Sequence, residues 1–156
     1  MPNTNPLTVT PEAMEFKLKR ASETAYVDYA FYFGGTAENS SNLTDWENLK
    51  GVCGIKIFMG SSTGSLLSAT DEEIDKIFAN GKRVIAVHAE DEAMMNENKI
   101  TILKDSNDVK MHNIWRSEES CFNATKRVVS IAKKYKRPVH VLHITTAQEM
   151  DYLRQN

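Results

Sequence analysis

The sequence predicts an α/β fold in which parallel strands alternate with helices. Two observations carry this prediction: four short apolar segments have the composition of buried strands, and the segments between them carry helix-start and helix-end signals. Such an alternation is typical of a parallel sheet covered by helices. A doubly wound sheet and a (β/α)8 barrel both fit it. The 156 residues by themselves suggest one domain that can bury a sizeable core.

The first half of the chain is expected to contain two helices and two strands. Proline near the start of residues 11–24 predicts a helix there. Residues 26–35 (YVDYAFYFGG) are β-branched and aromatic and end in two glycines, which indicates a buried strand. A short helix over 43–50 precedes a second strand over 52–59 (VCGIKIFM), which continues into the small residues GSSTGS.

The second half repeats this pattern. Residues 71–80 (DEEIDKIFAN) have acidic residues in the first turn and Gly81 just past the end, which together indicate a helix. A long helix is predicted over 118–135, with Ser117 as its N-cap. The remaining predicted elements are strands over 83–88 (RVIAVH) and 138–144 (PVHVLHI) and a helix over 146–154.

Composition places the chain among ordinary globular proteins. The formal charge is −2 and 26% of the residues are charged, which excludes collagen-like, strongly disordered and highly basic nucleic-acid-binding classes. A sequence pI near 6.1 gives no reason to expect nucleic acid or a membrane as partner. No apolar run approaches the roughly 20 residues that a spanning helix needs. The opening MPNTNPLTVTPE lacks the basic and apolar regions of a signal peptide, so we do not expect these residues to act as one. We therefore predict a cytoplasmic protein with two reduced thiols, Cys53 and Cys121; one disulfide is the alternative.

Three successive predicted strands carry a residue that can bind metal at or near the carboxyl end. Lys56 lies in GIKIFMG, His88 ends VIAVH and His143 ends VHVLH. Carboxyl ends of parallel strands meet at one face, so these side chains are expected to lie close together. Neutral imidazole is a good Zn²⁺ ligand. Each histidine alone also fits a structural role, and Lys56 needs a partner or a modification because a buried ammonium is costly.

Two further histidines receive other interpretations. His140 is three residues before His143, so strand alternation predicts that it points to the opposite face, away from the site. His112 falls in a long loop predicted after the third strand and is interpreted as structural or as packing within that loop.

Four motifs, GIKIFMGSSTG, VIAVHAEDE, HNIWRSEES and VLHITTAQE, occur together with the opening MPNTNP. In this combination the chain resembles dihydroorotases of the amidohydrolase superfamily from its first residue to its last. MPNTNP and KIFMGSSTG are specific signals, whereas VxHAED alone would be weak. The resemblance implies a (β/α)8 barrel with a pair of Zn²⁺ ions. It also implies reversible hydrolysis of the cyclic amide of dihydroorotate to carbamoyl aspartate, in pyrimidine biosynthesis.

The resemblance also implies roles for individual residues. Lys56 matches a lysine that takes up CO2 and becomes an N6-carboxylysine bridging both metals, while His88 and His143 match ligands of the second metal. Asn3 matches an asparagine that binds the substrate carboxylate. The RSxE element that contains Arg116 and Glu119 is interpreted as a helix start and a loop anchor.

The family pattern extends beyond these 156 residues. Its HxH pair and a substrate-binding arginine belong upstream of MPNT, its catalytic aspartate belongs beyond residue 156, and no HxH occurs in the chain. Such barrels typically take about 250 residues or more. We therefore expect residues 1–156 to form a single partial barrel domain, about strands two to six, that is inactive alone. Its two open sheet edges favour association. The predicted partner is therefore either a second copy of this chain, in a homo-oligomer, or another chain that completes the barrel.

Other functions also fit these motifs. Hydantoinase, dihydropyrimidinase and allantoinase place a similar lysine and two histidines on corresponding strands, and Asn3 favours a substrate that carries a carboxylate. A non-catalytic scaffold related to the amidohydrolases is a second alternative, and a doubly wound protein of unrelated function is a third.

Overall fold

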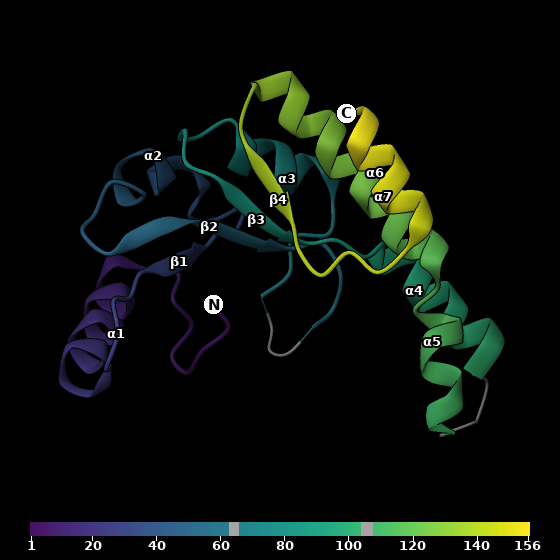
Figure 1. Cartoon of the computed structure of the whole chain (residues 1–156), viewed down its shortest axis with the longest axis horizontal. Coiled ribbons are helices and arrows are strands. Elements are labelled where there is room, and N and C mark those ends of the chain that lie inside the picture. Colours follow the sequence, from purple (N-terminus) through teal and green to yellow (C-terminus); the bar gives the residue numbers. More distant parts are fainter. Residues whose placement is uncertain (63–65, 104–107) are drawn as a thin grey trace.

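A computed structural model describes residues 1–62, 66–103 and 108–156 (Figure 1). The strands are β1 (Phe31–Gly34), β2 (Val52–Phe58), β3 (Ile85–His88) and β4 (Val139–Val141). The α-helices are α1 (Pro11–Thr24), α2 (Leu43–Trp46), α3 (Asp71–Phe78), α4 (Glu92–Asn98), α5 (His112–Trp115), α6 (Glu118–Tyr135) and α7 (Ala147–Gln155). Shorter helical turns are η1 (Ser40–Asn42), η2 (Lys99–Leu103) and η3 (Val109–Met111). Residues 63–65, at the end of the GSSTGS segment, lie outside the described residues.

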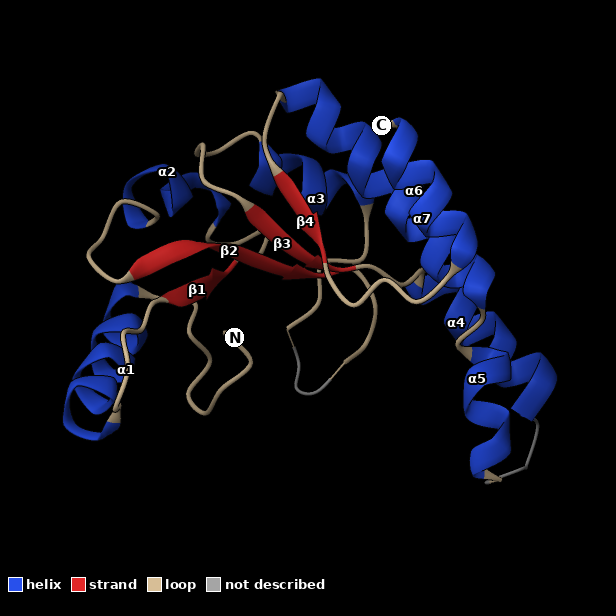
Figure 2. Cartoon of the chain, viewed as in Figure 1, coloured by secondary structure: helices blue, strands red, loops and turns tan. Residues whose placement is uncertain are grey.

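The four strands form one parallel sheet in the order β1-β2-β3-β4. Each strand therefore pairs with its successor, without the reversal of strand order that defines a doubly wound sheet. Figure 2 shows α2, α3 and α6 on one side of this curved sheet and the N-terminal segment on the other. The predicted α/β fold is confirmed, and its topology is that of an arc of a barrel.

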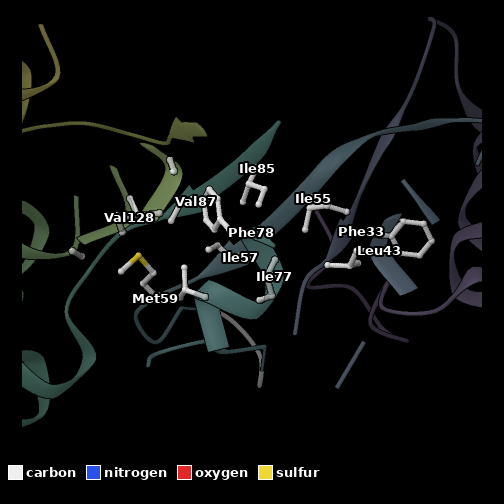
Figure 3. Close-up of a cluster of buried hydrophobic side chains, with 14 of the residues drawn as sticks. Phe33, Leu43, Ile55, Ile57, Met59, Ile77, Phe78, Ile85, Val87 and Val128 are labelled. Carbon is white, nitrogen blue, oxygen red and sulfur yellow. The ribbon is translucent and has the colours of Figure 1, made fainter. Parts of the chain in front are cut away.

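The core lies between the sheet and the helices α3 and α6 (Figure 3). Alternate residues of each strand point toward these helices, which is the period-two pattern of a pleated strand. Fully buried members include Phe33, Ile55, Ile57, Ile85 and Val87 from the strands, Ile77 and Phe78 from α3, and Val128 from α6. The opposite sheet face is left for the polar residues described below.

Capping residues fix where the helices that flank the site begin. The Ser117 side chain accepts a hydrogen bond from the backbone N–H of Ser120, so α6 begins as predicted. Thr70 and Glu73 form a reciprocal capping box at the start of α3. Gly81 follows α3 with a φ of 100°, a backbone conformation that glycine adopts without strain.

A buried ion pair closes the end of the sheet away from the candidate site. Arg137 Nη2 donates to Glu47 Oε2 at 2.9 Å, and both side chains are almost fully buried. Arg137 also donates to the carbonyl of Ile77 at 3.0 Å and to that of Arg83 at 2.9 Å. The ion pair and these hydrogen bonds therefore connect the end of α2, the end of α3 and the segment just before β4.

Several sequence predictions were wrong in extent: the helix over 43–50 ends at Trp46, and the strand over 138–144 spans only Val139–Val141. The strand predicted over 26–35 begins only at Phe31, because Phe31 pairs with Val52, the first residue of β2; Tyr26 is fully exposed. The segment after β3 is not one long loop, because α4, η2, η3 and α5 occupy much of it. His112 is the first residue of α5.

Cys53 and Cys121 are both free thiols, as predicted. Within the described part of the chain, no helix has the length and hydropathy needed to span a bilayer.

Candidate functional site

The candidate site lies at the carboxyl ends of β2, β3 and β4. Lys56 pairs in register with Ala86, and Phe58 pairs with His88. Strand alternation therefore places Lys56 and His88 on the same sheet face, opposite the core residue Ile57. The parallel register is what brings these two polar residues to one face.

His143 reaches the same site through a backbone turn after β4. Its φ is 42°, in the left-handed region that few residues other than glycine adopt. His143 Nε2 lies 2.9 Å from His88 Nδ1, and the ring centroids are 4.8 Å apart. Burial, and next the charge of His88, lower the pKa of His143. Two histidines separated by 55 residues in sequence thus face each other directly.

The sequence argument about His140 was wrong about the face on which it lies. His140 pairs with Ala86, which in turn pairs with Lys56, so all three residues share one face. The argument assumed that the strand continues to His143, whereas the left-handed turn breaks the alternation after β4. His140 is nevertheless exposed and takes no part in the contact between His88 and His143.

Lys56 is buried, with 1% of its surface exposed. Its Nζ donates to the carbonyl of Ile57 at 2.6 Å and lies 3.5 Å from the centroid of the Phe58 ring. Burial lowers the pKa of Lys56 to about 7, because the charged form is poorly solvated there. A large fraction of this amine is therefore neutral near neutral pH. The charge of Lys56 also contributes to lowering the pKa of His143.

A carboxylate that the sequence argument did not single out contacts His88 from the other side. Glu90 Oε2 lies 2.6 Å from His88 Nε2, and the same oxygen accepts a hydrogen bond from Arg116 Nη1. Arg116 Nη2 donates to the carbonyl of Ser61, just after β2, at 2.6 Å. Burial raises the pKa of Glu90, but the hydrogen bonds from His88 and Arg116 outweigh burial and lower it overall. The sequence signal that could have identified Glu90 is its position two residues after His88, just past the end of the same strand.

A pocket of about 560 Å³ opens beside these residues. His88, His143, Glu90 and Arg116 line it, and so does His112. The interpretation of His112 as a purely structural loop residue was therefore incomplete, since the side chain borders the site. The two named residues of the RSxE element have different environments. Arg116 anchors the loop after β2, whereas Glu119 is exposed in the first turn of α6.

Asn3 lies in the N-terminal segment that covers the same sheet face. It is half-buried and does not line the pocket. This segment contacts the sheet closely at Gly34, where a Cβ atom would approach Val9 and Pro2.

The separation of the two histidine nitrogens can be compared with the separation of two nitrogen ligands on one Zn²⁺ ion. Tetrahedral Zn²⁺ with nitrogen ligands at about 2.0–2.1 Å holds two such nitrogens about 3.3 Å apart. The separation of 2.9 Å between His88 Nδ1 and His143 Nε2 needs to widen by only a few tenths of an ångström. Among the described residues, no group of three or more His, Cys, Asp or Glu side chains is arranged to hold a metal ion. The donor pair fits Zn²⁺, and a complete coordination shell requires further ligands.

Comparison with known proteins identifies the relatives of this chain. No family model matches it. A dihydroorotase from Thermococcus kodakarensis is 30% identical over 149 residues, which cover 94% of this chain and 30% of that protein. This chain is homologous to the dihydroorotases. An allantoinase from Arabidopsis thaliana is 34% identical to this chain over 94 residues, which cover 56% of the chain and 19% of the allantoinase.

The structural comparison supports the same relationship. The L-hydantoinase (dihydropyrimidinase) from Arthrobacter aurescens matches with a TM-score of 0.89 and 26% identity, over 99% of this dihydroorotase homologue and 35% of the hydantoinase. The chain thus spans about a third of the length of these relatives. This likeness, with the sequential parallel sheet, confirms the predicted partial (β/α)8 barrel fold.

Proposed function

We propose that this chain supplies part of the active site of a Zn²⁺-dependent dihydroorotase. In this proposal the complete enzyme reversibly hydrolyses the cyclic amide of dihydroorotate to carbamoyl aspartate. The observation that carries the proposal is the direct contact of His88 with His143 on the sheet face that also holds the buried Lys56. The homology to dihydroorotases supports this choice among metal-dependent hydrolases.

Each site residue has a proposed task. His88 and His143 would hold one Zn²⁺ through Nδ1 and Nε2, the nitrogens that face each other. A bound Zn²⁺ polarises a carbonyl oxygen and lowers the pKa of a water molecule. Lys56 would bind metal as N6-carboxylysine; its lowered pKa supports this, because the neutral amine is the form that attacks CO2. Asn3 would donate its amide N–H to the substrate carboxylate.

A different cyclic amide is the second candidate substrate. The structural match to L-hydantoinase and the sequence match to allantoinase favour it, because all of these names describe opening of a cyclic amide or ureide. Asn3 distinguishes the two substrates within the proposal, since hydantoin lacks the carboxylate that dihydroorotate carries. A non-catalytic scaffold is the third candidate.

The test uses the protein translated from the complete reading frame that contains these residues. We expect hydrolysis of dihydroorotate to exceed that of hydantoin, and His88→Ala or His143→Ala to remove both the activity and one bound Zn²⁺. His140→Ala is the matched control, because this exposed histidine on β4 lies outside the contact between His88 and His143. Residues 1–156 alone are expected to be inactive. Turnover of hydantoin but not dihydroorotate would reject the proposed substrate, and full-length protein without Zn²⁺ would favour the scaffold.

A further inference from the structure

We infer that Glu90 and Arg116 are positioning residues that set the tautomer of His88. Glu90 holds the ring proton on Nε2, so that the lone pair of Nδ1 points toward His143 Nε2, where the metal would bind. This inference rests on the proposed function, because it assigns His88 as a metal ligand. It concerns the two side chains on the other side of His88: Glu90, which contacts the ring nitrogen that faces away from His143, and Arg116, which contacts Glu90.

The hydrogen bonds determine which nitrogen of His88 carries the proton. A neutral imidazole has one N–H donor and one acceptor nitrogen, and an ionised carboxylate is only an acceptor. Glu90 Oε2 lies 2.6 Å from His88 Nε2, so Nε2 is the donor and Nδ1 is the acceptor. The acceptor nitrogen is the one that faces His143 Nε2 at 2.9 Å. The carboxylate therefore selects the tautomer that a metal at this position requires.

Arg116 keeps the carboxylate ionised and in place. Glu90 is 7% exposed, and an unpaired buried carboxylate is strongly destabilising. Arg116 Nη1 donates to the same Oε2 atom that accepts from His88, and its Nη2 donates to the Ser61 carbonyl at 2.6 Å. One guanidinium thus connects the carboxylate to the backbone just after β2, the strand that carries Lys56.

Ser61, whose carbonyl accepts a hydrogen bond from Arg116, is also held by a second carboxylate. Glu92, at the start of α4, accepts hydrogen bonds from the backbone N–H and the side-chain hydroxyl of Ser61, both at 2.6 Å. Among the described residues, the Glu92 carboxylate accepts hydrogen bonds from Ser61 and Asn96 and not from His88, although Glu92 lies only two residues beyond Glu90. It therefore offers a matched control: a nearby carboxylate that holds the same loop without contacting the histidine.

The two roles for Glu90 differ in what its removal changes. A carboxylate that only anchors a loop affects stability, whereas a positioning carboxylate also affects the proton on His88 and the metal affinity. Carboxylates that accept a hydrogen bond from a metal-binding histidine typically contribute 10–100-fold to metal affinity. The experiment therefore compares Glu90→Leu, Glu90→Gln, Arg116→Met and Glu92→Gln, with His88→Ala as a reference for metal binding, in the metal-free and Zn²⁺-titrated chain.

The first readout is long-range ¹H–¹⁵N NMR of histidine-labelled, metal-free chain under conditions where His88 is neutral. The wild-type protein and Glu92→Gln are expected to show His88 only as the Nε2–H tautomer, with its ring proton protected from exchange. Glu90→Leu is expected to populate the Nδ1–H tautomer and to lose that protection. Glu90→Gln, whose amide oxygen can still accept, is expected to restore the wild-type tautomer.

The second readout is Zn²⁺ affinity by competition with a chelator. Glu90→Leu is expected to lower the affinity about 10–100-fold, and Arg116→Met to lower it in the same direction, while Glu92→Gln leaves it unchanged. An Nδ1–H tautomer in the wild type, or an unchanged tautomer and Zn²⁺ affinity in a folded Glu90→Leu variant, would overturn the inference. If wild-type Zn²⁺ binding equals that of His88→Ala, the metal assignment fails instead, and the NMR result still decides the tautomer.

Discussion

Replacing Lys56 with methionine tests the energetic cost of burying this lysine. The side chain is 1% exposed, and its Nζ contacts the Ile57 carbonyl and the Phe58 ring. Burial lowers its pKa from an ordinary value of 10.5 to about 7. Methionine is unbranched and apolar, so it fills the same space without a titrating group.

The sign of the effect follows from the two pKa values. Between about pH 7 and 10.5 the unfolded state holds a proton on Lys56 that the folded state lacks, so the free energy of unfolding rises with pH in this window. Below about pH 7 both states are protonated, and the full cost of burying the charge applies. One proton corresponds to about 1.4 kcal/mol per pH unit, so the wild type gains about 2–3 kcal/mol between about pH 7.5 and pH 9.5. Lys56→Met lacks this gain.

Urea denaturation of metal-free protein in buffer without CO2 measures the effect, because the amine then stays unmodified. The wild-type free energy of unfolding should approach that of Lys56→Met from below as pH increases. The exposed Lys50 supplies the control: Lys50→Met should keep the wild-type pH dependence. Parallel pH curves for the wild type and Lys56→Met would refute the reasoning.

Three further predictions concern the rest of the fold. Glu47→Ala should lower the free energy of unfolding by about 3–5 kcal/mol in urea, because the buried Arg137 loses its ion-pair partner; a loss below about 1 kcal/mol would contradict this. Thr70→Ala should cost about 1 kcal/mol by thermal denaturation, because it removes the capping box with Glu73, and a variant as stable as the wild type would show that the cap is unimportant. Burial raises the pKa of Cys121 to about 11, so its thiol should react slowly with iodoacetamide at about pH 8 and faster as pH increases. Fast alkylation of Cys121 in the folded chain at about pH 8 would disprove the raised pKa.

The sequence predicted the regular elements best where local signals and tertiary packing agree. The helix over 118–135 was correct at both ends, because Ser117 caps its start and an apolar stripe packs on the sheet. The strand over 26–35 was too long, because composition alone does not reveal where pairing with β2 begins. The short helices between β3 and α6 lack the repeated apolar periodicity that would have predicted them.

The candidate site was predictable only in part, for a geometric reason. Strand ends indicated Lys56, His88 and His143, because parallel topology gathers such residues. Alternation failed at His140, since the backbone leaves the strand before His143. The contact of Glu90 with His88 depends on how the chain turns after β3, and strand periodicity carries no information about that turn.

The left-handed backbone at His143 restricts which amino acids can occupy this position. Besides glycine, the residues that adopt this conformation most readily are asparagine, aspartate and histidine. Zn²⁺ in proteins is bound by the ring nitrogen of histidine, the carboxylate of aspartate or glutamate, or the thiolate of cysteine. Only histidine and aspartate satisfy both requirements, so at this position the shape of the backbone narrows the choice of metal ligand before any metal is bound.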